Sequence, residues 1–257
     1  MPNQILQVRG LSKFFGGLAA IHEVDFHVRE GEILSVIGPN GAGKTTLFHL
    51  LTGIHRPSRG EILFQGCPIA HCPPHEISRR GIARTFQTTL LFGDLTVMDN
   101  VFMGYRSQMR CGLGDALLRT SRLKKEEQGC LAFSREILSL VGLWDQGGKT
   151  AKNLSQEAQK RLSIAMALAT KPRLLLLDEP TGGLIPEETA SLTGLFREIV
   201  KRGVTVCLIE HKMRVVMTIS DRILVLNHGV KIAEGPPQEI SRNRAVIEAY
   251  LGEDYVA

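Results

Sequence analysis

The sequence lacks a long apolar segment. No stretch approaches the roughly 18 uninterrupted apolar residues that a membrane-spanning helix needs. The first ten residues, MPNQILQVRG, also lack the apolar core of a signal peptide. The five cysteines are odd in number and widely spaced, which excludes a disulfide framework and favours reduced thiols. We therefore expect a cytoplasmic protein that does not itself cross a membrane.

Repeats, low-complexity tracts and a strong charge of one sign are absent as well. Lys and Arg number 31 against 26 Asp and Glu, so the net charge is only +5. A phosphate-binding protein, or one lying near anionic lipid, would show this sign, as would many other enzymes. The excess is too small and too scattered to predict a nucleic-acid partner. The length of 257 residues allows one large domain or two small ones that share a core.

Short apolar segments alternate with helical patterns over most of the chain. We expect strands at 23–28, 32–38, 60–66, 173–178, 204–210 and 222–229, and helices at 44–53, 74–80, 186–203 and 211–220. From about 89 to 165 helical patterns dominate, and within them residues 106–130 are polar, basic and interrupted by glycine, as in an insertion or an exposed helical hairpin. Strands alternating with helices predict an α/β fold with a mainly parallel sheet covered on both faces.

The strongest motif is GPNGAGKT, from Gly38 to Thr45. It matches the phosphate-loop pattern G-x-x-x-x-G-K-[ST] and lies between an expected strand and an expected helix. Its glycines let several backbone N–H groups face one phosphate, and the helix N-terminus adds partial positive charge. Lys44 can reach the β- and γ-phosphates, and the Thr45 hydroxyl can bind Mg²⁺. A chance glycine-rich turn would not place lysine and threonine in register. The predicted nucleotide-binding residues here are Gly38, Pro39, Asn40, Gly41, Ala42, Gly43, Lys44, Thr45 and Thr46.

The second motif is RLLLLDEP, residues 173–180. Its four leucines predict a buried strand, so Asp178 comes at the carboxyl end, where ligands bind in open α/β sheets. Asp178 can hold Mg²⁺ directly or through water, and Glu179 can polarise an attacking water. An acidic turn before Pro180 is the alternative interpretation, which the phosphate loop makes much weaker.

These motifs, with what lies between and after them, resemble the ATP-binding cassette (ABC) family of transporter ATPases over essentially the whole chain. The resemblance implies that Phe15 stacks on adenine, that Gln87 in RTFQ contacts the Mg²⁺ and water and faces a membrane partner, and that His211 in LIEH holds the γ-phosphate and orients Glu179. It also assigns Ser155 to the signature helix that completes a partner's site. Alternatives remain open: Phe15 in the core, Gln87 at a solvated strand end, and His211 at a helix start without a ligand.

The resemblance also implies the architecture. It predicts a P-loop ATPase with a core lobe (1–88 and 166–257), an N-terminal antiparallel β subdomain, and an inserted helical subdomain (89–165). ATP and Mg²⁺ are the implied cofactors. A chain with one cassette would pair with a second ATPase subunit, identical or different.

A narrower set of segments is similar to the LivG-type ATPases of branched-chain amino acid importers. These segments are FGGLAA, GIARTFQ, LFGDLTVMDNV with the polar insertion after it, LIEH and VIEAYLGE. The similarity implies two transmembrane permease subunits, an extracytoplasmic solute-binding protein acting indirectly, no nucleic acid, and a peripheral position on the cytoplasmic face of the inner membrane. Alternatives are an importer of urea or amides, a low-turnover regulatory ATP-binding module, and an ATP-dependent clamp on nucleic acid or ribosomes, although such clamps usually carry two cassettes in one chain.

Three positions depart from the family pattern. The signature, usually LSGGQ or LSYGQ, is LSQEA at 154–158; an acidic or amide residue is replaced by Ile185, and the usual Asp after the histidine by Lys212. We expect Ser155 to cap the signature helix and the Glu157 carboxylate to repel a partner's γ-phosphate. At about 5 Å and an effective dielectric near 20, that repulsion is roughly 3 kcal/mol. It would weaken the composite site unless Glu157 turns away or pairs with Lys160 or Arg161.

A group of cysteines and histidines falls at 67–75, but its C-x₄-C spacing fits no common zinc pattern, and two prolines divide it. We therefore predict no metal ligand beyond Mg²⁺, for which the candidates are Thr45, Gln87 and Asp178.

Overall fold

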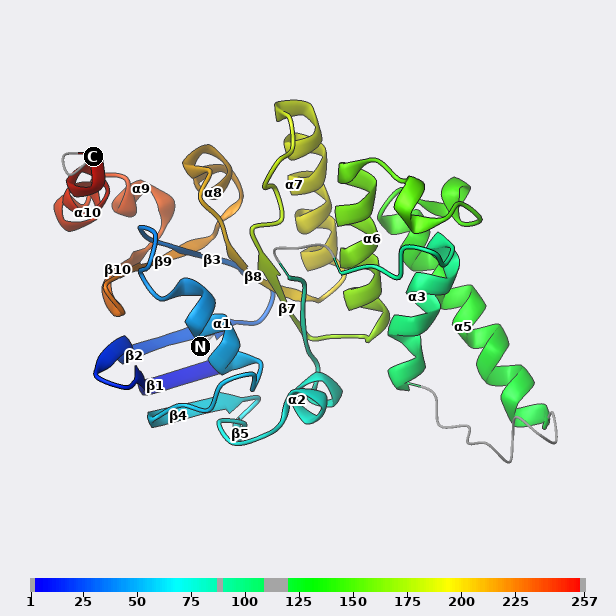
Figure 1. Cartoon of the computed structure of the whole chain (residues 1–257), viewed down its shortest axis with the longest axis horizontal. Coiled ribbons are helices and arrows are strands. Elements are labelled where there is room, and N and C mark those ends of the chain that lie inside the picture. The colour runs from blue at the N-terminus through cyan, green and yellow to red at the C-terminus, as the bar shows by residue number, and fades with distance from the viewer. Residues whose placement is uncertain (1–2, 87–89, 109–119, 255–257) are drawn as a thin grey trace.

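The computed structural model describes residues 3–86, 90–108 and 120–254, which form two sheets with helices packed around them (Figure 1). The strands are β1 (Gln4–Phe15), β2 (Leu18–Arg29), β3 (Ile33–Ile37), β4 (Arg59–Phe64), β5 (Cys67–Pro68), β6 (Ile82–Arg84), β7 (Leu174–Asp178), β8 (Thr205–Ile209), β9 (Arg222–Asn227) and β10 (Val230–Gly235). The α-helices are α1 (Lys44–Leu51), α2 (Pro74–Arg80), α3 (Val97–Tyr105), α5 (Ser121–Leu140), α6 (Gln156–Ala169), α7 (Pro186–Lys201), α8 (Met213–Ile219), α9 (Pro237–Ile240) and α10 (Arg244–Asp254). Short 3₁₀ helices are η1 (Arg106–Gln108), η2 (Trp144–Gln146) and η3 (Ala151–Asn153).

The larger sheet has the strand order β10-β9-β3-β8-β7-β6, and its neighbours are parallel except for β9 and β10. The run of leucines in β7 shows why this sheet is covered on both faces. Leu174 and Leu176 pack into the cluster that holds α1, whereas Leu175 and Leu177 pack into the cluster that holds α6 and α7. The predicted mainly parallel α/β core is confirmed.

The smaller sheet is antiparallel, with the order β2-β1-β4-β5, and lies on the other side of α1 (Figure 1). Leu6 and Val8 of β1 share a buried cluster with Leu47 and Phe48 of α1. This confirms the predicted N-terminal antiparallel sheet, although β1 itself was not anticipated from its residues. Its pairing with β2 shifts register at several points along the strand, so apolar residues do not alternate regularly.

Helices α3, α5 and α6 pack together beside α7, away from the antiparallel sheet (Figure 1). The helix α6 runs through the expected boundary at 165/166 and ends at Ala169. Of the expected insertion at 106–130, the last part belongs to the single helix α5, while 109–119 lie outside the described residues. Within the described part of the chain, none of the helices combines the length and the apolar character needed to cross a bilayer.

Candidate nucleotide site

The phosphate loop connects β3 to α1 in a tightly packed left-handed turn. Gly38 has φ 150° and Gly43 has φ 98°. A Cβ at Gly38 would lie 2.0 Å from the carbonyl oxygen of Leu226, and one at Gly43 would lie 2.5 Å from that of Ala20. Neither position tolerates a side chain without moving the backbone. The two glycines therefore let the loop pass against β9 and β2 and enter α1 with its first N–H groups turned toward the loop.

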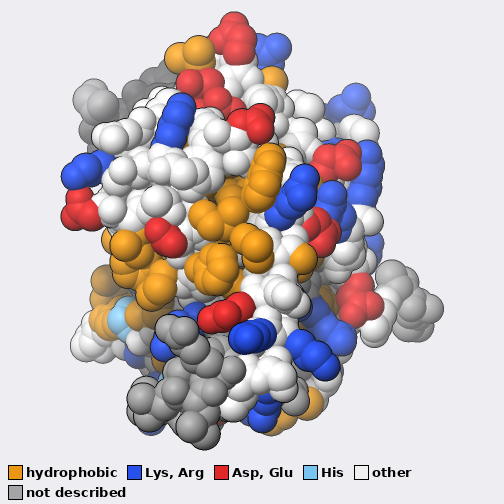
Figure 2. Space-filling view, turned by 90° about the vertical axis from the view of Figure 1, so that its right-hand side faces the viewer, with side chains coloured by type: hydrophobic (Ala, Val, Ile, Leu, Met, Phe, Trp, Pro, Cys, Tyr) orange, Lys and Arg blue, Asp and Glu red, His pale blue; other side chains and the backbone are white. Residues whose placement is uncertain are grey.

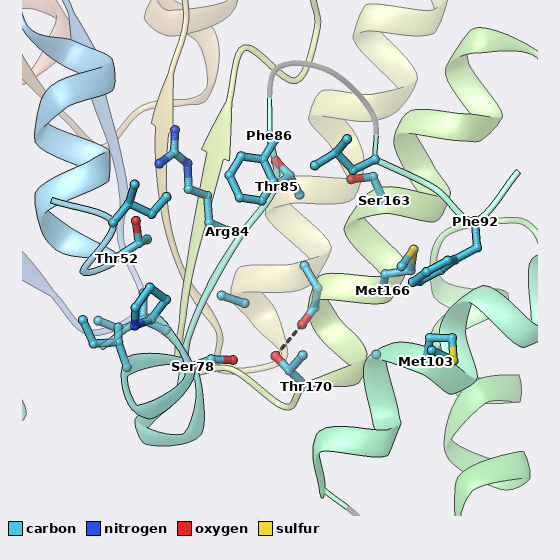
Figure 3. Close-up of a pocket in the computed structure, with 18 residues that line it drawn as sticks. Thr52, Ser78, Arg84, Thr85, Phe86, Phe92, Met103, Ser163, Met166 and Thr170 are labelled. Carbon is cyan, nitrogen blue, oxygen red and sulfur yellow. Dashed lines mark hydrogen bonds between the residues drawn. The ribbon is translucent and has the colours of Figure 1, made fainter. Parts of the chain in front are cut away.

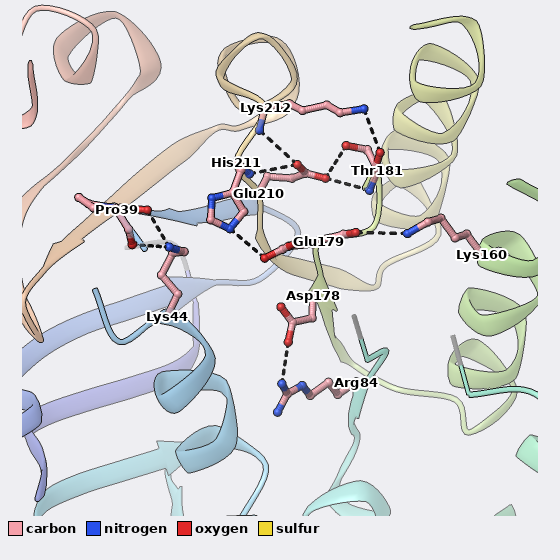
Figure 4. Close-up of polar contacts among 11 residues, drawn as sticks. Pro39, Lys44, Arg84, Lys160, Asp178, Glu179, Thr181, Glu210, His211 and Lys212 are labelled. Atoms are coloured by element: carbon pink, nitrogen blue, oxygen red, sulfur yellow. Dashed lines mark hydrogen bonds and ion pairs between the residues drawn. The ribbon is translucent and has the colours of Figure 1, made fainter. Parts of the chain in front are cut away.

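Lys44 is the first residue of α1 and folds back over this loop. Its Nζ donates to the carbonyl oxygens of Gly38 and Pro39, each at 2.7 Å (Figure 4). The residue is only 6% exposed, so the ammonium group is held inside the loop rather than on an open surface. Next to it, Thr45 is exposed at the start of the helix, and Thr46 is half-buried. An exposed hydroxyl beside a phosphate loop suits a hard cation such as Mg²⁺.

The strands β7 and β8 bring the acidic motif and the histidine together. Asp178 is paired with Ile209 in the parallel register, so the residues after the two strands leave the sheet side by side. Glu179 has φ 47°, a left-handed conformation that is uncommon and strained outside glycine. From that turn its Oε1 lies 2.8 Å from Nε2 of His211 (Figure 4). The predicted partners are thus in direct contact.

A second polar network, which the sequence reasoning missed, lies beside this pair. The buried carboxylate of Glu210 accepts from the N–H and the hydroxyl of Thr181, at 2.9 and 2.6 Å, and from the N–H of His211 at 3.1 Å. The departure at Lys212 joins the same network, because its Nζ donates to the carbonyl oxygen of Thr181 at 3.0 Å (Figure 4). The same Nζ also donates to the carbonyl oxygen of Leu184 at 3.0 Å. Lys212 therefore fastens the turn after β7 to the histidine segment.

The residue expected to stack on adenine is at the surface. Phe15 is 44% exposed, which excludes the alternative of a core residue. The His55 ring meets its ring edge-on with centroids 5.3 Å apart, and Nζ of Lys13 lies 4.9 Å from its centroid. An exposed aromatic ring at the end of β1 is available to a planar base. Gln87, the other residue implied by the resemblance, lies outside the described residues.

The signature segment confirms the expected cap. Ser155 precedes α6, and its side-chain oxygen accepts from the N–H of Ala158 at 3.3 Å. The structure also shows the exception foreseen for Glu157, whose Oε1 lies 2.8 Å from Nε of Arg161. Arg161 is itself held by Val141 O at 2.9 Å and Ser191 Oγ at 2.7 Å. The carboxylate is therefore neutralised within its own helix, and the expectation of uncompensated repulsion does not hold for this geometry.

This pairing changes the expected behaviour of the signature variants. On the expectation that α6 completes a partner's site, Arg161→Gln should lower ATP hydrolysis in the assembled complex about tenfold, because the unpaired carboxylate of Glu157 would then repel the partner's phosphate in a partly screened site. Glu157→Gly alone should change the rate by less than about threefold, and should restore most of the activity in the Arg161→Gln background. Rates at saturating MgATP provide the measurement. A several-fold increase in Glu157→Gly would show instead that Arg161 fails to neutralise the carboxylate.

The arrangement fits a magnesium-bound nucleoside triphosphate. The turn at Gly38 and Gly43 packs against β9 and β2 and leads into the N-terminus of α1, a place that favours an anion, and the candidates Thr45 and Asp178 offer the oxygen ligands that Mg²⁺ prefers. Lys160 adds a half-buried ammonium group whose Nζ lies 3.4 Å from the Glu179 carbonyl oxygen. Burial lowers the pKa of Lys160. In the described part of the chain, no group of three or more His, Cys, Asp or Glu side chains comes together as a metal site.

A phosphate loop at the carboxyl edge of a mainly parallel sheet, with an acidic strand end two strands away at the same edge, makes the chain a P-loop nucleotide-binding protein. A family model described as "ABC transporter" matches residues 21–182, and one described as "Branched-chain amino acid ATP-binding cassette transporter" matches 230–256. The chain belongs to the ABC transporter family and is an ATPase of that family.

Full-length relatives support the same assignment. The high-affinity branched-chain amino acid transport ATP-binding protein LivG of Salmonella typhimurium is 42% identical over 98% of this chain and 100% of its own length. BraF of Pseudomonas aeruginosa, with the same description, is 41% identical over the same shares. A crystal structure of the ADP conformation of an ABC transporter cassette has a TM-score of 0.85, is 30% identical, and covers 97% of this chain and 99% of its own.

Proposed function

We propose that the chain is the ATP-hydrolysing subunit of an importer for branched-chain amino acids. The hydrolytic part of this proposal rests on the 2.8 Å contact between the Glu179 carboxylate and the His211 ring. Both residues follow strand ends at the edge of the sheet where Asp178 also lies. The solute is inferred from the full-length relatives, whose names specify branched-chain amino acid transport, and from the C-terminal family match at 230–256.

The residues divide the work of hydrolysis among them. The loop amides and Lys44 bind the β- and γ-phosphates, so Lys44 exchanges loop carbonyls for phosphate oxygens. Thr45, Asp178 and Gln87 would hold Mg²⁺, which neutralises charge on the phosphates. Glu179 takes the proton of the attacking water, and His211 orients Glu179 and donates to the γ-phosphate. Most of the acceleration comes from positioning and preorganised charge.

The composite site requires partners. Two cassettes, of this chain alone or with a second ATPase subunit, would enclose two ATP molecules, each completed by Ser155 and the N-terminus of α6 from the opposite cassette. Two transmembrane permease subunits would hold the pair at the cytoplasmic face of the inner membrane, and an extracytoplasmic protein would deliver the solute. In this assembly the helical part at 89–165 acts as a subdomain inserted into the core lobe of 1–88 and 166–257.

Reconstitution tests this function directly. The chain, co-purified with its permeases and second ATPase in proteoliposomes with the binding protein, should import leucine, isoleucine or valine only with MgATP, and saturating urea should not compete. ATP turnover without amino acid import, or import of urea or an amide, would contradict the proposed solute. Binding of ATP without turnover in the complete assembly would favour the regulatory alternative.

A further inference from the structure

Arg84, which the sequence reasoning did not single out, ends the edge strand β6 and reaches the acidic end of β7. In the parallel register Arg84 is paired with Leu176, two residues before Asp178. Its Nη2 donates to Oδ2 of Asp178 at 2.7 Å, and both side chains are only 4% exposed (Figure 4). A buried guanidinium is thus joined to the carboxylate to which we assign Mg²⁺ binding.

The surroundings fix the guanidinium but satisfy little of its hydrogen-bonding capacity. Its carbon lies 5.6 Å from the Phe48 ring centroid and 5.1 Å from that of Phe86. Among the described residues, Nε and Nη1 of Arg84 are buried without a hydrogen-bond partner. Arg84 lines a cavity of about 430 Å³ between α2 and α6, and Figure 3 shows its side chain pointing from there toward α1.

A buried ion pair of this kind adds little to the stability of the fold. A buried ion pair barely compensates for the desolvation of its two charges, and a well-packed apolar pair often replaces it without loss. Unpaired buried N–H groups make the balance worse. What the guanidinium does supply at this place is a fixed positive charge against the carboxylate of Asp178.

We propose that Arg84 is a positioning residue whose guanidinium pairs with the Asp178 carboxylate and competes with Mg²⁺ for it. The inference rests on the proposed role of Asp178 in the function above. A divalent cation and a guanidinium cannot share a buried carboxylate without mutual repulsion. Arg84 therefore keeps Asp178 paired when the metal is absent and weakens the binding of the metal when it arrives.

The test uses Mn²⁺ as a paramagnetic substitute for Mg²⁺, titrated into the full chain with bound ATP and followed by electron paramagnetic resonance. Arg84→Met should bind Mn²⁺ at least about tenfold more tightly than the natural protein, because a nearby positive charge is gone. Arg84→Lys, which keeps the charge, should stay within about threefold. Arg79→Met removes an exposed arginine from α2 and should leave the affinity unchanged. Equal or weaker Mn²⁺ binding in Arg84→Met would overturn the proposal.

The failure of the proposed function would look different. A natural protein that binds no ATP in the presence of either metal would overturn both the function and this inference, whereas altered metal affinity concerns Arg84 alone. Should Arg84→Met fail to fold, ¹⁵N-arginine labelling of the natural protein decides instead. The Arg84 Nε–H resonance, assigned by its loss in Arg84→Lys, should shift when Mg²⁺ is added to the ATP complex and not when ATP is added with a chelator. If this resonance did not shift on addition of Mg²⁺, the proposal would be overturned.

Discussion

Glu179→Gln is expected to bind MgATP and yet hydrolyse it about 10²–10⁴ times more slowly than the natural protein, the range lost with a general base. Glutamine keeps the size of the side chain and can still hydrogen-bond to Nε2 of His211, which lies 2.8 Å from the carboxylate. The strained backbone at φ 47° is unaffected by the side-chain change. ATP should therefore accumulate between two cassettes, and the protein should elute as a dimer in size-exclusion chromatography with ATP.

A matched control distinguishes the loss of the general base from the mere loss of a negative charge. Glu187→Gln removes an exposed carboxylate from the first turn of α7 and should leave both turnover and elution unchanged. Dimer formation by Glu179→Gln should require ATP and disappear with ADP. Turnover in Glu179→Gln at the natural rate would exclude Glu179 as the base, whatever its contact with His211.

Local motifs explain why so much of the site could be predicted from the sequence. The phosphate loop and the acidic strand end are each contiguous, so Lys44, Asp178 and Glu179 could be assigned from spacing. The expected cap at Ser155 and the pairing of Glu157 with Arg161 also follow from helical spacing. Contiguous motifs do not reveal which residues at the ends of different strands lie in contact. The contact of His211 with Glu179 was implied only by the family resemblance.

The missed residues all act across the sheet. Arg84 meets Asp178 from a strand 94 positions away, and Glu210 meets Thr181 from 29 positions away. Neither has a local pattern that distinguishes it from an ordinary strand-ending charge. Lys212 illustrates the same limit, since its departure from the family pattern did not reveal that its side chain donates to the turn after β7.

Lys44→Ala is expected to reduce ATP affinity roughly 100-fold, because charge-assisted hydrogen bonds to phosphate contribute about 1.5–3 kcal/mol. The lysine is held at the loop by Gly38 O and Pro39 O, at 2.7 Å each, so its ammonium group is already oriented where the phosphates would bind. Binding of a fluorescent ATP analogue, with ATP turnover in parallel, is the measurement.

The buried position of Lys44 adds a structural expectation to the functional one. Two loop carbonyls lose a donor in Lys44→Ala, so the melting temperature should fall modestly while the circular dichroism spectrum stays that of the natural protein. At the same ATP concentration, the melting temperature of the natural protein should then rise more than that of the variant, since a ligand stabilises the folded state more when it binds that state more tightly. Lys152→Ala, which removes an exposed lysine, should keep the full ATP-dependent rise. If Lys44→Ala showed the same rise and hydrolysed ATP at the natural rate, the loop at Gly38–Thr45 could not be the phosphate site. The roles assigned to Asp178 and Glu179 would then also be wrong, because they depend on phosphates bound at that loop.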